Sequence, residues 1–136
     1  MMVEKTFAII KPDAVAAGYT GAIIEIIERN KFNILGMQKV QLTRTQAEQF
    51  YDVHAERSFF TELVDYMISG PVVIMALEQE NAINNWRDLM GATNPANAAP
   101  GTMRKMFGTS IGNNATHGSD APETARKELA FFFPNL

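Results

Sequence analysis

The run Val72-Val73-Ile74-Met75-Ala76-Leu77 decides how this chain folds, because it is wholly apolar and follows the break Ser69-Gly70-Pro71. It is too short for a typical helix and far below the roughly 20 residues that a helix needs to cross a bilayer. A continuous apolar run of this kind beside a Gly-Pro break is typical of a strand buried inside a sheet. The sequence therefore predicts a central strand here.

Two more strands are predicted before the central one. Residues 6–10 are apolar and rich in β-branched side chains, and they stop at Lys11-Pro12-Asp13, where a turn is favoured. Residues 32–42 alternate between apolar and polar side chains, and Val40 and Leu42 stand at the same alternate positions as Phe32 and Ile34. Gly36 marks a possible bend in this strand. Residues 107–116 are sparsely patterned and hold at most a short strand.

Helices are predicted between the strands, where apolar residues recur three or four positions apart. Thr43 with Gln46 predicts a capping box, and Asp120 with Glu123 predicts another, with Pro122 in the first turn of the last helix. The apolar stripes are Ala22, Ile23, Ile26 and Ile27; Ala47, Phe50, Tyr51 and His54; Phe60, Leu63, Val64 and Met67; residues 81–90, closed by Gly91; and Ala125, Leu129 and Phe132.

The order of these elements predicts an α+β fold. Strands and helices alternate without the strict rhythm of a doubly wound sheet, which favours a split βαβ arrangement on a mostly antiparallel sheet. The chain has 136 residues, enough for one hydrophobic core, so we expect a single domain over residues 1–136.

Composition excludes several classes of function. The formal net charge is −3, so stable nucleic-acid binding is not expected. The chain contains no cysteine, which removes disulfides, thiolate nucleophiles and cysteine metal ligands and suits a reducing compartment. It starts Met-Met-Val-Glu-Lys, without the apolar run of a secretory signal. We therefore expect a cytoplasmic protein that does not bind membranes.

His117 is the strongest candidate for chemistry. It lies in a polar run over residues 113–120, directly before the last predicted helix, where the helix dipole favours anions. A neutral imidazole there can act as base, metal ligand or nucleophile, or be an ordinary turn histidine. Metal binding is poorly supported, because no second histidine stands at ligand spacing. Glu128 lies within folding reach and could orient the ring, or simply be a surface charge.

Phosphate binding would need side chains. The sequence has neither a P-loop nor a Gly-x-Gly-x-x-Gly turn after a strand. Lys11 ends the first strand, and Arg87, Thr93 and Arg104 lie in or beside the long polar loop over residues 92–101. Each of these is individually an ordinary surface or turn residue, so only their convergence would indicate a site.

Taken together, several motifs resemble the nucleoside diphosphate kinase family over nearly the whole chain. The most specific is Asn114-Ala115-Thr116-His117-Gly118-Ser119-Asp120. The others are Ile9-Ile10-Lys11-Pro12-Asp13, Phe59-Phe60, Ser69-Gly70-Pro71, Arg87 with Gly91-Ala92-Thr93-Asn94-Pro95, and Pro100-Gly101-Thr102-Met103-Arg104.

This resemblance implies a ferredoxin-like βαββαβ sandwich, with helices packed on a four-stranded sheet. It also implies transfer of the γ-phosphoryl group of a nucleoside triphosphate to a nucleoside diphosphate through a phosphohistidine. Mg²⁺ would be bound with the nucleotide. A homo-oligomer, tetramer or hexamer, is also implied, although the chain ends at Leu136 without the longer tail that some members use in subunit contacts.

The resemblance also implies a role for each site residue. His117 would be the nucleophile, Glu128 would fix its ring, and Lys11 would serve both catalysis and binding. The substrate-binding residues would be Lys11, Arg87, Thr93, Arg104 and Asn114 for phosphates and ribose, Tyr51 to steady Lys11, and Phe59 and Ile111 to sandwich the base. Asp120 would reach the metal through water.

The chain departs from the family pattern at a few positions. Ser58 stands where proline usually precedes the phenylalanine pair, and Lys105-Met106 replace a small residue and an aspartate. Two other functions stay open at this point. A nucleotide-binding regulatory module without turnover would share the fold, but it would be expected to lack His117 or Arg104. A nucleic-acid-binding or structural role is disfavoured by the net acidity and by the lack of a basic stripe.

Overall fold

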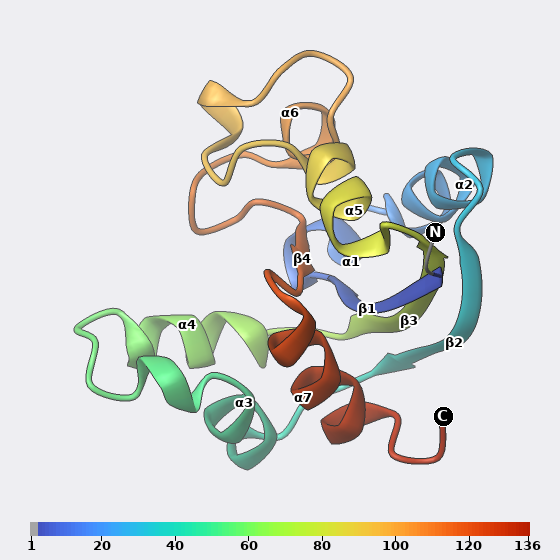
Figure 1. Cartoon of the computed structure of the whole chain (residues 1–136). Coiled ribbons are helices and arrows are strands. Elements are labelled where there is room, and N and C mark those ends of the chain that lie inside the picture. The colour runs from blue at the N-terminus through green and yellow to red at the C-terminus, as the bar shows by residue number, and fades with distance from the viewer. Residues whose placement is uncertain (1–2) are drawn as a thin grey trace.

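A single four-stranded sheet organises the molecule, shown here as a computed structural model that describes residues 3–136 (Figure 1). The prediction that the chain starts without a secretory signal includes Met1 and Met2. These two residues lie outside the described residues. The strands are β1 (Val3–Ile10), β2 (Asn33–Val40), β3 (Val72–Glu80) and β4 (Thr116–Gly118). Their order is β2-β3-β1-β4, and all neighbours are antiparallel. This confirms the predicted ferredoxin-like α+β fold.

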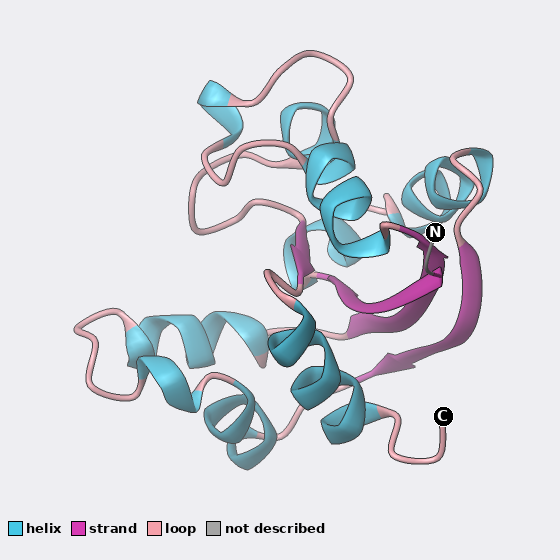
Figure 2. Cartoon of the chain, in the orientation of Figure 1, coloured by secondary structure: helices cyan, strands magenta, loops and turns pink. Residues whose placement is uncertain are grey.

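Helices cover both faces of the sheet (Figure 2). Residues of α2 and α5 pack on one face, and residues of α3, α4 and α7 pack on the other. None of the helices within residues 3–136 combines the length and apolar character that a membrane span requires. The helices are α1 (Pro12–Ala16), α2 (Thr20–Arg29), α3 (Arg44–Phe50), α4 (Phe60–Met67), α5 (Ala82–Met90), α6 (Met103–Phe107) and α7 (Pro122–Phe132), with 3₁₀ turns at Asp52–His54 and Pro95–Asn97.

The predicted central strand is β3, which pairs with β1 on one side and β2 on the other. Val73, Met75 and Leu77 join the core beneath α2 and α5. Val72 and Ile74 join the core beneath α3, α4 and α7. Because alternate side chains enter two different cores, the strand carries no polar positions in its first six residues.

The predicted bend at Gly36 is confirmed, and it changes which face the rest of β2 presents. The register between β2 and β3 shifts between Ile34 and Gly36. Phe32 contributes to the core beneath α2 and α5, whereas Val40 and Leu42 belong to the opposite core. The expectation of one continuous apolar side was therefore wrong, because an extra residue at a bulge moves every later side chain to the other face.

Local signals at the helix ends were partly right. Thr43 and Gln46 form the predicted capping box at the start of α3. Asp120 does not cap α7: the N-cap is Ala121, which makes no side-chain cap bond, and Pro122 opens the helix. His54 does not continue the stripe of α3, because that helix ends at Phe50 and His54 lies in the following 3₁₀ turn. The short helices α1 and α6 were not predicted.

Candidate active site

His117 lies within β4, which pairs with the end of β1 and forms an edge of the sheet. Residues 118–121 separate it from α7 in the sequence, and Glu123 and Thr124 of the first turn of α7 line the same pocket as His117, as the sequence predicted for a histidine beside a helix N-terminus. Its side chain is 20% exposed. The ring of Phe50 meets the imidazole edge-on with the centroids 5.5 Å apart. A rigid strand and an aromatic wall thus fix the ring while one side stays open.

Glu128 of α7 holds one nitrogen of that ring. The Nε2 atom of His117 lies 3.1 Å from Glu128 Oε1 and 3.2 Å from Oε2. Ser119 Oγ donates to the same carboxylate at 2.7 Å. Because an ionised carboxylate only accepts hydrogen bonds, this contact places the proton on Nε2. Nδ1 then carries the lone pair and is the nitrogen free to attack.

The backbone of His117 is fixed from the opposite face of the sheet. Trp86 Nε1, on α5, donates to the His117 carbonyl at 3.3 Å. A Cβ atom at position 118 would lie 2.4 Å from Trp86 Cδ1, so only glycine allows this approach. The close packing brings α5, and with it Arg87, against the strand that carries His117.

Lys11 and Asn114 meet beside the histidine, although they are far apart in the sequence. Lys11 Nζ donates to Asn114 Oδ1 at 2.9 Å, and Asn114 Nδ2 donates to the Thr93 carbonyl at 3.0 Å. Lys11 is only 9% exposed. Burial, with the positive charge of Arg104 as a smaller cause, lowers the pKa of Lys11 to about 8, and Asp13 opposes the shift. An anion bound beside this ammonium group would further stabilise its charged form.

Arg87 and Arg104 are brought together at the neighbouring corner. Arg104 donates from Nη1 to the Gly91 carbonyl and from Nη2 to the Thr116 carbonyl, both at 3.0 Å, while its buried Nε has no partner among the described residues. Burial lowers the pKa of Arg104, and the charge of Arg87 lowers it further. Both arginines and Thr93 line a pocket of about 630 Å³. Two guanidinium groups facing one cavity suit a polyanion.

Phe59 and Ile111 have the exposure that a base platform needs. Phe59 is 45% exposed at the start of α4, and Ile111 is 63% exposed in the loop after α6. The ring of His54 supports Phe59, with the centroids 5.4 Å apart.

Two residues remain to be compared with their expected roles, Tyr51 and Asp120. Tyr51 was expected to steady Lys11, but its buried hydroxyl has no hydrogen-bond partner within residues 3–136, and Asn114 takes that role instead. Burial raises the pKa of Tyr51, and the charge of Glu128 adds to the effect. Asp120 is exposed and, with His117, lines a pocket of about 440 Å³.

Sequence reasoning missed two residues that enter this site. Asp13 Oδ2 accepts a hydrogen bond from the Ala115 backbone N–H at 3.2 Å, and Asp13 Oδ1 accepts one from the Tyr66 hydroxyl. Asp13 belongs to a predicted turn and to one of the motifs of the family resemblance, neither of which gave it a role, and no pattern indicated a role for Tyr66. Their partners lie 102 and 53 positions away, so no local pattern could have found them.

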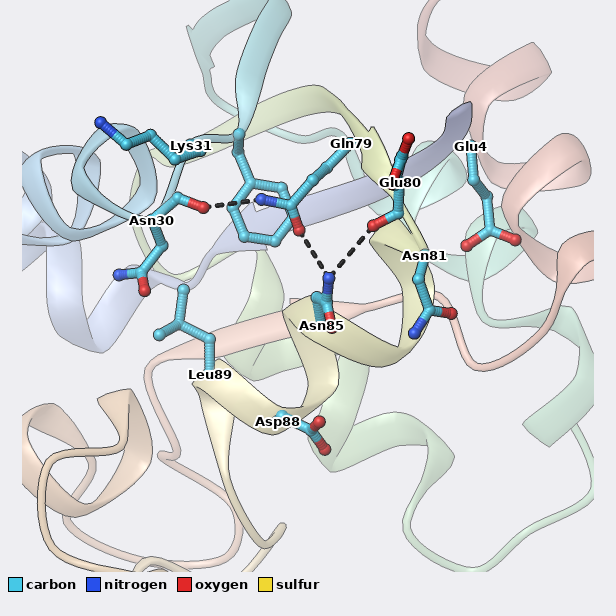
Figure 3. Close-up of a pocket in the computed structure, with 10 residues that line it drawn as sticks. Glu4, Asn30, Lys31, Gln79, Glu80, Asn81, Asn85, Asp88 and Leu89 are labelled. Atoms are coloured by element: carbon cyan, nitrogen blue, oxygen red, sulfur yellow. Dashed lines mark hydrogen bonds between the residues drawn. The ribbon is translucent and has the colours of Figure 1, made fainter. Parts of the chain in front are cut away.

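A larger pocket, of about 990 Å³, lies at the turn between β3 and α5 (Figure 3). There Gln79 Nε2 donates to the Asn30 carbonyl at 2.6 Å, and Asn85 Nδ2 donates to Gln79 Oε1 at 2.8 Å. The described residues that line it do not include His117, Lys11 or Arg104. The candidate site residues therefore lie outside this larger pocket.

Comparison with known proteins identifies what this arrangement is similar to. The family model described as nucleoside diphosphate kinase matches residues 4–136. The nucleoside diphosphate kinase of Pelobacter propionicus is 58% identical over 133 residues, which is 98% of this chain and 97% of the relative. That of Trichlorobacter lovleyi is 59% identical over 130 residues, covering 96% and 94%.

Solved structures agree. The Aquifex aeolicus nucleoside diphosphate kinase superposes with a TM-score of 0.95 at 44% identity and covers 97% of this chain and 96% of that one. The enzyme from Encephalitozoon cuniculi gives a TM-score of 0.92 at 36% identity, covering 96% and 88%. Sequence and fold similarity therefore extend over almost all of both chains.

Proposed function

The chain belongs to the nucleoside diphosphate kinase family and is an enzyme that transfers phosphate between nucleoside phosphates. From this premise we propose that the γ-phosphoryl group passes through a covalent phosphohistidine at His117. The observation that carries the proposal is the contact of Glu128 with Nε2, which leaves Nδ1 as the free nucleophile. Lys11, Arg87 and Arg104 supply positive charge around it.

The reaction consists of two displacements at phosphorus. In the first, the Nδ1 lone pair forms a bond to the γ-phosphorus of a nucleoside triphosphate, and the bond to the bridging oxygen breaks, releasing a nucleoside diphosphate. In the second, a terminal oxygen of another diphosphate attacks the same phosphorus and the nitrogen–phosphorus bond breaks. As the first bond forms, the ring gains positive charge, which the carboxylate of Glu128 stabilises through Nε2–H.

The remaining site residues would position the phosphates and spread their charge, which is most of what phosphoryl transfer asks of a protein. We assign phosphate and ribose contacts to Lys11, Thr93 and Asn114, in addition to the two arginines. Mg²⁺ would arrive with the nucleotide. The resemblance to the family assigns Asp120, which lines the pocket of His117, a contact to that ion through water.

Initial-rate kinetics test this proposal. A covalent intermediate requires the first diphosphate to leave before the second binds, so double-reciprocal plots at several acceptor concentrations should be parallel. Intersecting lines would mean that both nucleotides are bound at once, and the phosphohistidine proposal would then be rejected even if kinase activity were present.

Glu128→Ala should slow phosphorylation of His117 by about 10- to 100-fold without eliminating it, because orienting partners of this kind contribute that much. The ring would lose the carboxylate that fixes Nε2 but would keep its nucleophilic nitrogen. Single-turnover labelling with a nucleoside triphosphate measures the rate. Glu123→Ala, which changes another carboxylate of α7, serves as the control. An unchanged labelling rate in the Glu128 variant would contradict this role.

Base selectivity should be weak. Phe59 and Ile111 would offer stacking and apolar contact, which all bases satisfy. Purine and pyrimidine, ribo and deoxy substrates should therefore have similar kcat/KM values. A difference above about 10³-fold between ATP and dCTP, roughly 4 kcal/mol, is more than stacking can supply and would show that a base edge is read.

Three further properties follow from family membership as proposals. The chain acts as a single domain over residues 1–136, assembles as a homo-oligomer, tetramer or hexamer, and works in the cytoplasm. The match over residues 4–136 supports the first. Multi-angle light scattering would distinguish the assembly states, and a monomer alone would contradict the second.

A further inference from the structure

Ala115 has an unusual backbone conformation two residues before His117. Its φ is 74°, and it is one of three non-glycine residues with positive φ within residues 3–136. A Cβ atom disfavours this region, so neighbouring groups must hold the residue there. Ala115 is fully buried, and it directly follows Asn114, the partner of Lys11. The conformation of one residue therefore sets where both Asn114 and His117 lie.

A local hydrogen bond from the Thr116 N–H to the Asn114 carbonyl at 2.9 Å closes a tight turn around Ala115, and the groups that bond Ala115 itself come from the start of the chain. The Lys11 backbone N–H donates to the Ala115 carbonyl at 2.7 Å. The Ala115 N–H donates to Asp13 Oδ2 at 3.2 Å. Both polar groups of this residue are thus bonded within the segment that follows β1, which is also the segment that presents the Lys11 ammonium group.

The second oxygen of Asp13 connects this corner to α4. The hydroxyl of Tyr66 donates to Asp13 Oδ1. Burial, followed by this hydrogen bond, raises the pKa of Tyr66, so the hydroxyl keeps its proton and remains a donor. Helix α4 begins immediately after Phe59. Asp13 therefore lies between the helix of the proposed base platform and the strand of the proposed nucleophile.

We propose that Asp13 and Tyr66 form a clamp, the Asp13–Tyr66 clamp, that positions the segment Asn114–His117 for phosphoryl transfer. The clamp touches no reacting atom. It acts by fixing the left-handed Ala115 and by setting the distance between Lys11 and His117. As a contribution to catalysis, this inference rests on the proposed role of His117.

The carboxylate of Asp13 has a second effect that a neutral substitute would lose. The charged groups that face Lys11 are Arg104 from α6 and Asp13 from α1. Arg104 lowers the Lys11 pKa and Asp13 raises it. Removing the negative charge must therefore shift the loss of the Lys11 proton to lower pH. Replacing an aspartate that does not face Lys11, such as Asp65 on the surface of α4, would leave that titration unchanged.

Two variants, each with a matched control, test the clamp. Asp13→Asn removes the charge but keeps the size, and Asp65→Asn is its control on the surface of α4. Tyr66→Phe removes one hydroxyl, and the exposed Tyr19→Phe is its control. Hydrogen exchange at the Ala115 amide and the pH profile of kcat/KM are measured for all four and for the unaltered protein.

The clamp predicts faster exchange at Ala115 in Asp13→Asn, and a smaller increase in Tyr66→Phe. Asp13→Asn should lower kcat/KM at least about tenfold, since small misplacements near reacting atoms cost up to about 100-fold. Loss of the Lys11 proton, whose pKa is about 8, should give kcat/KM an alkaline limb, and in Asp13→Asn that limb should move to lower pH. Tyr66→Phe should lower kcat/KM less and leave that limb in place, because the charge remains. Both controls should match the unaltered protein.

Exchange at Ala115 does not require nucleotide, so this readout separates the clamp from the function of the site. Faster exchange supports the clamp even in a protein that forms no phosphohistidine, which would refute only the proposed function. A folded Asp13→Asn protein with the exchange rate, kcat/KM and alkaline limb of Asp65→Asn would overturn the clamp. Should Asp13→Asn fail to fold, Tyr66→Phe decides: exchange and kcat/KM equal to those of Tyr19→Phe would overturn it.

Discussion

Replacing His117 with alanine should reduce phosphoryl transfer by at least about 10⁴-fold, the scale of loss seen when a covalent nucleophile is removed. The loss should be this large because His117 Nδ1 is the proposed nucleophile and Glu128 holds the other nitrogen of the ring. The variant should remain folded, since the ring lies at an edge strand and is partly exposed. Coupled assays of nucleoside triphosphate formation measure the loss, and circular dichroism checks the fold.

The matched control for this experiment is His54→Ala, which removes the other histidine. Its ring packs beside Phe59 and Tyr51, and within residues 3–136 it forms no hydrogen bond with Glu128, whose partners are His117 and Ser119. This variant should keep its phosphoenzyme and lose activity only modestly. Comparable losses in both variants would show that the effect of His117→Ala is not specific to the nucleophile.

Removing either arginine should chiefly lower kcat. Charge on the transferring phosphoryl group is redistributed in the transition state, and one preorganised donor at such a place contributes about 10²- to 10³-fold. Arg87 is exposed, so Arg87→Ala should keep the stability of the unaltered protein. Arg104→Ala should also lower the free energy of unfolding by about 1–3 kcal/mol, because the carbonyls of Gly91 and Thr116 lose their donor.

Arg29→Ala is the control for both arginine variants, because Arg29 pairs only with Glu25 on the surface of α2. It should change neither kcat nor stability. Steady-state kinetics and denaturant unfolding separate the two effects. A raised KM with unchanged kcat would contradict the prediction and would mean that the arginine binds ground state and transition state equally.

Parts of the fold follow from short-range patterns. The run Val72 to Leu77 is apolar because it feeds two cores, and that pattern needs no knowledge of its partners. The Thr43 capping box depends on residues three positions apart. The motif around His117 carried the resemblance that predicted the family, and the family match confirms that prediction. These features were predictable because the physics that causes them is contained within a few residues.

The remaining features depend on contacts across the chain. The face of β2 changes at a bulge, and nothing in the alternation of residues 32–42 specifies on which side Val40 will pack. Ala115 adopts a left-handed conformation because Lys11 and Asp13 hold it, whereas its own side chain argues against it. Tyr51 was assigned a partner that the structure gives to Asn114. Such contacts only become visible once the sheet is assembled.

The proposed function requires that His117 holds the phosphoryl group covalently between two half-reactions. Incubation with a γ-labelled nucleoside triphosphate and Mg²⁺, without an acceptor, tests it most directly. A phosphohistidine at His117 predicts about one label per chain, located on His117. As a phosphoramidate, this label should be labile in acid and stable in alkali, and any nucleoside diphosphate should remove it. A label on a hydroxyl group such as Ser119, or no label while transfer proceeds at full rate, would contradict it.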